Sequence, residues 1–360
     1  MYNDDRRNLT GVIIILLLAA ALVAFFIFVK VEEKKDLEEA IQEAEEYEAE
    51  MGSLRGDADK VYNSLVERLT IPDFVIWGDE GAAGVNGSLV PEFTAAAEAD
   101  LFGSFDAAYS AETQRTITSD LTVNMYNMGV TREGMKEILA RSGAKKMVTR
   151  NAIVIPAGEN GKVNLEIADE DGNDLHFAGQ KNVKFDETTI SGVSGKLTEG
   201  DGEYDADHPH LAFVRARSGE ETAAPEGTAI ETEISGRYTD SIPVLFFDNI
   251  VTGSNGKASP DTGAAIADLK TLAKSHKPAA DNDWYVIVVT AEEGSETDKA
   301  LRDAFGDHYI CNNKIAEDMT DEDYAALAEK VYETIKSQGC FDSVIEEVNK
   351  ATAELEGTGK

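Results

Sequence analysis

Five short apolar segments alternate with stretches of helical periodicity from Phe74 onward, and this alternation restricts the possible fold more than any other feature. Apolar runs that alternate with helices are typical of a parallel sheet covered by helices on both faces. The expected strands are Phe74–Trp77, Leu121–Tyr126, Pro243–Phe247, Trp284–Thr290 and His308–Cys311. The expected helices are Pro91–Asp100, Thr131–Ser142, Ala264–Ser275, Thr297–Phe305 and Asp321–Ser337. The sequence therefore predicts an α/β domain.

One long interval, residues 147–240, interrupts this alternation. Its apolar residues recur at every second position, and turn signals such as Asn160-Gly161 and Asp171-Gly172 separate them, which is typical of antiparallel strands. We expect strands at Ala152–Ile155, Val163–Ile167 and Ala212–Ala216. The acidic stretch Asp169–Asp174 resembles a calcium loop superficially, but it lacks the twelfth-position glutamate and the flanking helices, so a hairpin turn is expected. The interval predicts an all-β insertion that divides the α/β domain into residues 57–146 and 241–345, followed by a tail at 346–360.

The first 56 residues are of a different kind. Gly11 to Val29 is an uncharged apolar run close to the roughly 20 residues that a helix needs to cross a bilayer. A cleaved signal peptide would have a shorter apolar region that ends in small residues, whereas this run ends in Phe28-Val29. We expect a transmembrane helix within residues 1–30 and a helical stalk at 31–56. Basic residues flank the run on both sides, so charge leaves the topology open.

Charge and cysteine content exclude several classes of function. The chain has 33 Lys and Arg against 68 Asp and Glu, a formal net charge of -35, and this excess argues against nucleic-acid binding. Cys311 and Cys340 are too few for a disulfide framework or a zinc site. They form either one bridge outside the cytoplasm or two free thiols. We expect neither a cofactor nor a metal.

The stretch VIWGDEGAAG, which runs from Val75 to Gly84, contains the most suggestive local pattern. Gly78-Asp79-Glu80 directly follows the first expected strand, and loops at the carboxyl ends of parallel strands carry the reactive groups of such sheets. Taken alone, the glycines also fit a plain sharp turn. The stretch is therefore a candidate site only in combination with others.

Four stretches in order resemble the blocks of the GDSL, or SGNH, hydrolase family. They are Trp77–Gly84, Asn127-Met128-Gly129, Phe247-Asp248-Asn249 and the segment Ile315–Asp318 before the last helix. A subgroup of that family is similar in carrying a β-rich insertion between the second and third blocks. The resemblance implies a flavodoxin-like three-layer α/β/α fold and an ancestry among enzymes that cleave esters and acyl groups.

The resemblance also implies which residues occupy the catalytic positions. The family's nucleophilic serine, its histidine base and the aspartate that orients the histidine correspond to Glu80, Asp318 and Ile315, and none of these can play its family role. The oxyanion-type positions are Gly129, through its backbone amide, and Asn249, through its side chain. A replacement base is hard to supply, because the chain has only five histidines.

These observations favour a membrane-anchored cell-envelope protein whose SGNH-like domain has lost its Ser-His-Asp triad. We expect a non-catalytic binding or structural module, with a cell-surface glycan or peptide as the candidate ligand and an extracytoplasmic location inferred from the habit of the family. The alternative is an active esterase or glycan-modifying enzyme that uses non-standard residues, such as Glu80 and Asp318 as a carboxylate pair.

Overall fold

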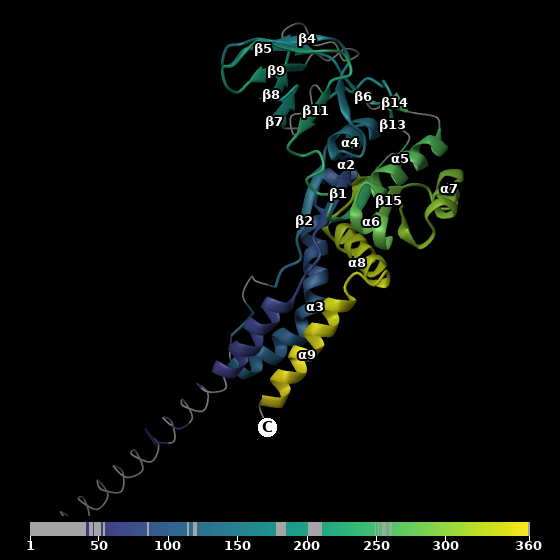
Figure 1. Ribbon diagram of the computed structural model, residues 1–360. Helices are drawn as coiled ribbons and strands as arrows, with labels where there is room; N and C mark the ends of the chain where they lie inside the picture. The colour runs from purple at the N-terminus through teal and green to yellow at the C-terminus, as the bar shows by residue number, and fades with distance from the viewer. Residues whose placement is uncertain are drawn as a thin grey trace, which may run out of the picture. The chain divides into compact units, whose positions relative to one another are not determined.

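The computed structural model describes residues 41–42, 46, 52, 55–84, 86–113, 115–117, 121–177, 185–200, 211–248, 250, 252–253, 257–258 and 261–358 (Figure 1). The chain divides into two compact units. One comprises residues 68–104 and 118–349, and the other residues 1–67, 105–117 and 350–360. The expected membrane span, Gly11–Val29, lies outside the described residues. Within the described residues, no helix is both long enough and apolar enough to span a membrane.

The larger unit contains a parallel sheet of five strands, in the order β16-β15-β12-β1-β2. The strands are β1 (Phe74–Gly78), β2 (Met125–Gly129), β12 (Ile242–Phe247), β15 (Val286–Thr290) and β16 (Tyr309–Asn312). Each was expected at this place in the chain. The second begins at Met125 and not at Leu121, because the register with β1 pairs Met125 with Phe74.

Helices connect the strands of this sheet. They are α2 (Glu80–Ala83), α3 (Leu89–Thr113), α4 (Met135–Ser142), α5 (Thr262–Lys274), α6 (Lys277–Asn282), α7 (Glu296–Phe305), α8 (Asp321–Ser337) and α9 (Asp342–Thr358). Helix α8 begins with a capping box, in which the Thr320 hydroxyl accepts from the Asp323 amide. Residues 346–360 were expected to form a C-terminal tail. The structure instead continues helix α9 through this segment as far as Thr358.

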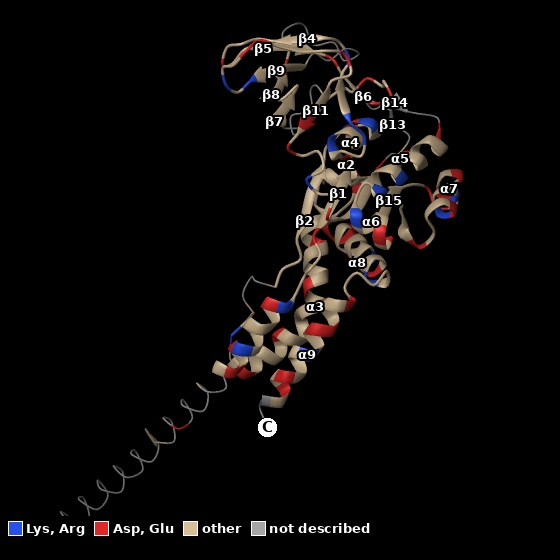
Figure 2. Ribbon diagram, viewed as in Figure 1, with Lys and Arg blue, Asp and Glu red and all other residues tan. Residues whose placement is uncertain are grey.

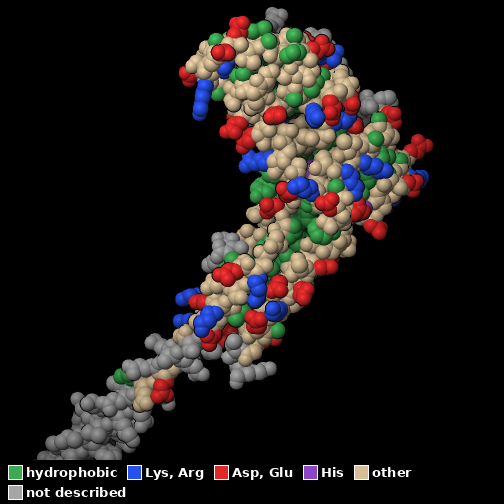
Figure 3. Space-filling model, in the orientation of Figure 1, with side chains coloured by type: hydrophobic (Ala, Val, Ile, Leu, Met, Phe, Trp, Pro, Cys, Tyr) green, Lys and Arg blue, Asp and Glu red, His purple; other side chains and the backbone are tan. Residues whose placement is uncertain are grey.

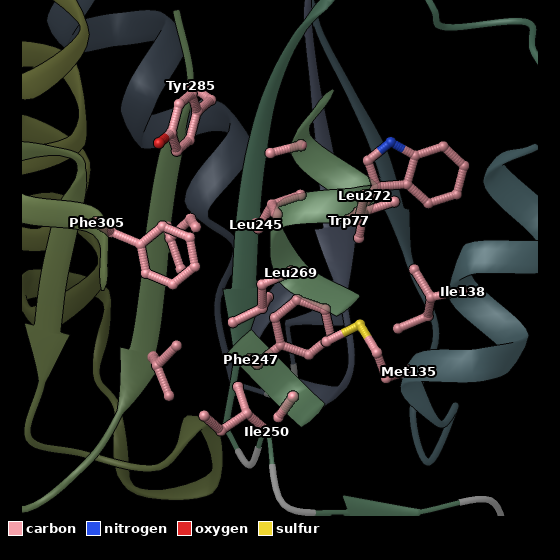
Figure 4. Close-up of a cluster of buried hydrophobic side chains, with 14 of the residues drawn as sticks. Trp77, Met135, Ile138, Leu245, Phe247, Ile250, Leu269, Leu272, Tyr285 and Phe305 are labelled. Atoms are coloured by element: carbon pink, nitrogen blue, oxygen red, sulfur yellow. The ribbon is translucent and has the colours of Figure 1, made fainter. Parts of the chain in front are cut away.

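The central strands β1, β12 and β15 are buried on both faces, which explains why their sequences are nearly continuous apolar runs. On one face Val75, Trp77, Leu245 and Phe247 form a core with apolar residues of α4, α5 and α7, among them Ile138, Leu269, Leu272 and Phe305 (Figure 4). On the other face the ring of Phe74 packs 5.0 Å from that of Phe93 in α3 and 5.7 Å from that of Phe341. Charged residues lie mainly on the helices and loops, and β1 is drawn without any (Figure 2).

The interval 147–240 is an all-β insertion, as expected. Its main sheet has seven antiparallel strands in the order β5-β9-β8-β7-β11-β3-β6, and β4 pairs separately with β10. The strands are β3 (Met147–Thr149), β4 (Ile153–Ile155), β5 (Lys162–Leu165), β6 (Ile167–Asp169), β7 (Phe185–Ile190), β8 (Val193–Glu199), β9 (Leu211–Arg215), β10 (Thr222–Ala224) and β11 (Ala229–Thr232). The expected single strand Val163–Ile167 is divided at Glu166 into β5 and β6, which lie at opposite ends of the sheet order.

Helix α4 holds the insertion through polar contacts along one side. Lys136 Nζ donates to Asn173 Oδ1 at 3.0 Å, and the His176 amide donates to Glu137 Oε1 at 3.1 Å. The acidic stretch Asp169–Asp174 is a turn, in which the buried Asp169 carboxylate accepts from the amides of Asp171 and Asn173. Asp171 and Asp174 pair with Lys145 and Arg150. The carboxylates of Asp169, Asp171 and Asp174 therefore stabilise the turn and its contacts with Lys145 and Arg150.

The smaller unit is mainly helical where it is described. Residues 55–67, the last part of α3 and the last part of α9 contribute to it. The ring of Tyr62 stacks on that of Phe105 at 6.5 Å, and the Tyr109 hydroxyl donates to Asp59 Oδ1 at 2.6 Å. Burial and this bond raise the pKa of Tyr109 to about 12.

Candidate functional site

The carboxyl edge of the parallel sheet is the first place to look for a site. The chain goes from β1 to β2 on one side and then returns to β12 on the other side of β1. Open parallel sheets bind ligands outside the carboxyl ends of their strands, at the point where the strand order reverses. Here that point lies between Gly78-Asp79, at the end of β1, and Asp248, after β12.

Glycines allow the turn after β1 to pack directly against its neighbours. A Cβ at Gly78 would lie 1.7 Å from the carbonyl oxygen of Phe246, and one at Gly129 would lie 2.3 Å from the amide nitrogen of Ala83. Only glycine permits such close approach of two backbones. The short helix α2 is thereby fixed between β2 and β12, with Asp79 as its N-cap and Glu80 as its first residue.

A chain of hydrogen bonds connects the ends of four neighbouring strands. Asp79 Oδ1 accepts from the Asp248 amide at 2.7 Å, and Asp248 Oδ1 accepts from the Thr290 hydroxyl at 3.0 Å. Asn312 Nδ2 donates to Thr290 Oγ1 at 3.2 Å. We call Asp79, Asp248, Thr290 and Asn312 the strand-end network. The strand-end network also holds the loop after β16 in place, because Asp248 Oδ2 accepts a hydrogen bond from the Ala316 amide at 2.8 Å.

The electrostatics around this network are dominated by carboxylates. Burial raises the pKa of Asp248, the bonds from Ala316 and Thr290 oppose that shift, and the charges of Glu80 and Glu317 raise the pKa further. Glu80 Oε1 itself accepts from the Arg132 amide at 3.0 Å. The charges of two further carboxylates thus act on Asp248, and the place would disfavour a developing negative charge.

The structure places the residues of the expected triad as follows. Glu80 is half-buried at the turn after β1, while Asp318 is exposed in the short 3-10 helix η3 (Ala316–Asp318). Ile315 precedes η3 and is 44% exposed. The segment adjoins the turn after α2, because Asn86 Nδ2 donates to the Glu317 carbonyl at 2.6 Å. Across the described ranges, no hydrogen bond or ion pair joins Glu80 to Asp318.

Of the two oxyanion-type positions, the structure describes only Gly129, and its amide already has a hydrogen-bond partner. The Gly129 amide donates to the side-chain oxygen of Asn127 at 2.8 Å, so it is already used. Asn249 lies outside the described residues. The backbone amide of Asp248, beside it, donates to Asp79. The donors that the structure describes at this edge therefore hold the loops together.

The histidines within the described residues lie elsewhere. His276 is buried, with Nε2 accepting from Trp77 Nε1 at 3.1 Å and Nδ1 facing the Leu272 carbonyl. His308 pairs with Asp283 at 3.1 Å, and the His176 amide binds Glu137. His208 and His210 are outside the described residues. In the described part of the chain, no histidine neighbours Glu80.

Groups that could hold a metal ion and the two cysteines are the remaining candidates. Among the residues that the structure describes, no three His, Cys, Asp or Glu side chains converge to hold a metal ion. Cys311 and Cys340 are both free thiols, and burial raises their pKa values, to about 12 for Cys340. The alternative of a bridge between them is therefore not what the structure contains.

Sequence reasoning missed the strand-end network. The sequence motifs single out Asp248 only as the neighbour of Asn249, and they do not include Thr290 or Asn312. A usable signal was present, because each is the last residue of an apolar strand or directly follows one. Polar residues at that position of adjacent parallel strands are expected to meet.

Comparison of the chain with protein-family models, with curated proteins and with solved structures finds no match.

Proposed function

We propose that this chain is a membrane-anchored cell-envelope protein whose SGNH-like domain has lost acyl-transfer chemistry and acts as a non-catalytic binding module for a cell-surface glycan or peptide. Gly11–Val29 is the anchor in this proposal. The folded domain is extracytoplasmic.

The observation that supports it most is the carboxylate character of the nucleophile position. An acyl transfer needs a nucleophile with a base beside it and donors aimed at a developing oxyanion. Instead, Glu80 occupies the turn, the charges of Glu80 and Glu317 act on Asp248, and the Gly129 amide donates to Asn127. Each of these features opposes an anionic intermediate.

The strand order agrees with the proposed family. Numbered in chain order, the five strands lie in the order 2-1-3-4-5, which is the flavodoxin-like arrangement that the resemblance implies. The insertion between the second and third of these strands is also in the expected place. This agreement supports a common fold and says nothing of a retained activity.

The proposal is tested with the 360-residue chain in detergent micelles. We expect no labelling by a serine-directed fluorophosphonate probe and no release of acetate from acetylated glycan. Turnover that Glu80→Ala abolishes would refute the loss of catalysis. Labelling that survives Glu80→Ala would refute it too, because another residue would then be the nucleophile. Protease accessibility of the domain on intact cells tests the extracytoplasmic location separately.

A second candidate function, carboxylate-dependent hydrolysis, is favoured by one observation. Asp248 has a raised pKa and lies near Glu80, and acid-base pairs in glycosidases consist of two carboxyl groups with different pKa values. However, both Asp248 oxygens already accept hydrogen bonds, from Thr290 and Ala316. Cleavage of a glycan by the chain that is lost in both Glu80→Gln and Asp248→Asn would favour this second function.

A further inference from the structure

One side of strand β2 (Met125–Gly129) has no partner strand among the described residues. β2 is the last strand in the order β16-β15-β12-β1-β2 and pairs only with β1 (Figure 1). The Phe74 amide donates to the Asn124 carbonyl at 2.8 Å, and the Val130 amide donates to the Gly78 carbonyl at 3.1 Å. In a parallel ladder every second residue of a strand bonds to a given neighbour. These two bonds therefore assign the even-numbered residues of 124–130 to β1.

The odd-numbered residues of β2 direct their backbone groups away from β1, and we call this row the β2 edge. They are Met125, Asn127 and Gly129. The Gly129 amide shows the direction, because it donates to the side-chain oxygen of Asn127 on its own strand, at 2.8 Å. Within the described residues, the backbone groups of Met125 and Asn127 form no hydrogen bond on that side. The β2 edge thus presents backbone donors and acceptors with no partner.

β2 lacks the features that usually protect an outer strand from a further strand. Charged side chains, proline and β-bulges serve this purpose in most sheets. The sequence of β2, MYNMG, contains neither a charged residue nor a proline. Its register with β1 is regular from the pair Phe74–Met125 to the pair Gly78–Gly129. Acidic side chains are spread over the visible face of the molecule (Figure 3), so an uncharged outer strand is a local departure from the character of the chain.

The core of the sheet also reaches the surface at this strand. Tyr126 and Met128 lie on the same face as Val75 and Trp77, which are their register partners in β1. Met128 is only partly buried, and Tyr126 is 38% exposed, with its ring 5.1 Å from that of Tyr238. The apolar face thus ends at β2 in side chains that solvent reaches.

The opposite end of the same face is closed. Tyr309 in β16 belongs to the same core and is 6% exposed. Leu301 and Phe305 of α7 are buried in that core, and the Arg302 guanidinium lies over the Tyr309 ring at 5.6 Å. A helix therefore covers the tyrosine of the outer strand β16. The exposure of Tyr126 is a property of β2 and not of both outer strands of this sheet.

Charge and backbone chemistry decide between the possible occupants of the β2 edge. A second copy would bring together two chains with a formal net charge of -35 each, which repel one another. A glycan could stack on Tyr126, but it has no row of alternating amides and carbonyls to pair with the strand. An extended peptide supplies such a row, and its alternate side chains would cover Tyr126 and Met128.

From these observations we propose that the β2 edge binds an extended, uncharged peptide segment of another protein, which adds to the sheet as a further strand. Apolar residues at alternate positions of the segment pack on Tyr126 and Met128. The inference rests on the function proposed above, because it assigns the peptide ligand of that function to a place. The two can fail separately, since labelling by the fluorophosphonate probe would refute the loss of catalysis and leave the β2 edge unchanged.

The test measures, by fluorescence anisotropy, the binding of a labelled peptide Thr-Val-Thr-Val-Thr with both ends blocked to the 360-residue chain in micelles. Asn127→Pro removes an outward amide and places a ring against the added strand. It leaves the bonds to β1 in place, because residue 127 directs its backbone groups away from β1. We expect the peptide to bind roughly tenfold more weakly to this variant.

Asn127→Ala is the matched control. It also removes the side chain that accepts from the Gly129 amide, but it keeps the backbone amide of residue 127. The Gly129 amide becomes free for the peptide, so binding should be equal or tighter. Tyr126→Thr should weaken binding by up to about fivefold, because the peptide loses a cross-strand apolar contact. Chemical denaturation establishes that each variant is folded.

Several outcomes would overturn the proposal. Equal weakening in Asn127→Pro and Asn127→Ala would mean that the peptide contacts the side chain and not the backbone of the strand. No binding of the peptide at millimolar concentration would remove the site. Self-association of the chain that Asn127→Pro abolishes, measured by analytical ultracentrifugation, would replace the peptide by a second copy. Binding of a neutral oligosaccharide that is lost in Tyr126→Thr and unchanged in Asn127→Pro would replace it by a glycan.

Discussion

The backbone amide of Asp248 donates a hydrogen bond of 2.7 Å to Oδ1 of Asp79, and this bond joins two strand ends that are 169 positions apart in the sequence. The whole β insertion lies between them. Its first and last main-sheet strands, β3 and β11, pair with each other, so the folded insertion brings its own ends together. That pairing lowers the entropic cost of placing β12 beside β1.

Replacing Asp79 tests the importance of this bond for stability. Asp79 is 3% exposed, and its Oδ1 accepts from the amides of both Asp248 and Gly81. Asp79→Ala leaves these donors without an acceptor, so we expect the free energy of unfolding to fall by about 1–3 kcal/mol. Chemical denaturation of the chain in micelles measures this change.

Asp79→Asn is the matched control, because the amide oxygen can still accept from both donors. It should lose clearly less stability than Asp79→Ala. If the two variants are equally destabilised, the negative charge and not the hydrogen-bond geometry is what the turn requires.

Asp248→Asn tests the raised pKa of that carboxyl. Burial raises the pKa of Asp248, so ionisation is harder in the folded chain than in the unfolded chain and opposes folding at neutral pH. As the pH falls through the raised pKa, the folded chain takes up the proton first and this opposition disappears. Asn keeps an oxygen for the Ala316 amide and an NH₂ group for Thr290. We therefore expect Asp248→Asn to melt at a higher temperature than the unmodified chain near pH 7.

The comparison at a second pH checks the sign. At a lower pH, near 4, the advantage of Asp248→Asn should shrink, because the folded unmodified chain takes up the proton on Asp248 before the unfolded chain does. A constant difference between the two melting temperatures at both pH values would contradict the raised pKa. Glu317→Gln removes one of the charges acting on Asp248. It should therefore raise the melting temperature near pH 7 by part of the amount expected for Asp248→Asn.

The positions of the parallel strands along the chain could be anticipated from the sequence because fully buried strands leave a strong signal. Segments such as Ile242–Phe247 and Val286–Thr290 are apolar at nearly every position and can hardly be anything but central strands. The insertion was less visible. Strand β7, with the sequence FDETTI, exposes a polar face, and its pairing with β8 and β11 is fixed by contacts distant in the chain. Local pattern therefore identified the kind of sheet but few of its strands.

The candidate site shows the same limit. Glu80 could be placed at the turn after β1 because glycines on either side mark that turn. The role of Asp248 could not be read from its neighbours, since it depends on Thr290 and Ala316, which reach it only when β15 and β16 are adjacent. Polar residues at strand ends indicate which side chains could meet, but which of them form hydrogen bonds follows from topology, and single-sequence patterns do not contain that.

The buried pair of Glu133 and Arg141 offers a prediction about the attachment of α4. Both side chains are almost fully buried, Arg141 Nε donates to Glu133 Oε1 at 2.7 Å, and Arg141 Nη2 donates to the Met128 carbonyl at 2.7 Å. Burial raises the pKa of Glu133, and the Arg141 charge opposes that shift. Arg141→Met leaves an unpaired carboxylate, so we expect a loss of about 3–5 kcal/mol in the free energy of unfolding.

Replacing both partners tests whether the loss of stability in Arg141→Met comes from the unpaired carboxylate of Glu133. Glu133→Gln/Arg141→Met removes both charges, so it should be more stable than Arg141→Met alone when measured by chemical denaturation. A double variant that is no more stable than Arg141→Met would contradict this account, because the carboxylate of Glu133 would then cost nothing after the loss of its partner.

His276 makes the stability of the chain depend on pH in the opposite sense from Asp248. Trp77 Nε1 can only donate, so His276 Nε2 accepts its hydrogen bond and Nδ1 carries the proton that faces the Leu272 carbonyl. Burial lowers the pKa of His276 below the ordinary value of 6.5, so the unfolded chain takes up a proton first as the pH falls. The contribution of His276 is therefore complete above about pH 6.5 and is lost progressively below it.

His276→Phe should cost about 1–3 kcal/mol near pH 7.5, because the Trp77 N–H loses its acceptor, and clearly less near pH 5.5. Melting temperatures at both pH values measure this, with Trp77→Phe/His276→Phe as the control that removes donor and acceptor together. A difference between His276→Phe and the unmodified chain that does not change with pH would mean that His276 titrates alike in the folded and unfolded chains, which would contradict its lowered pKa.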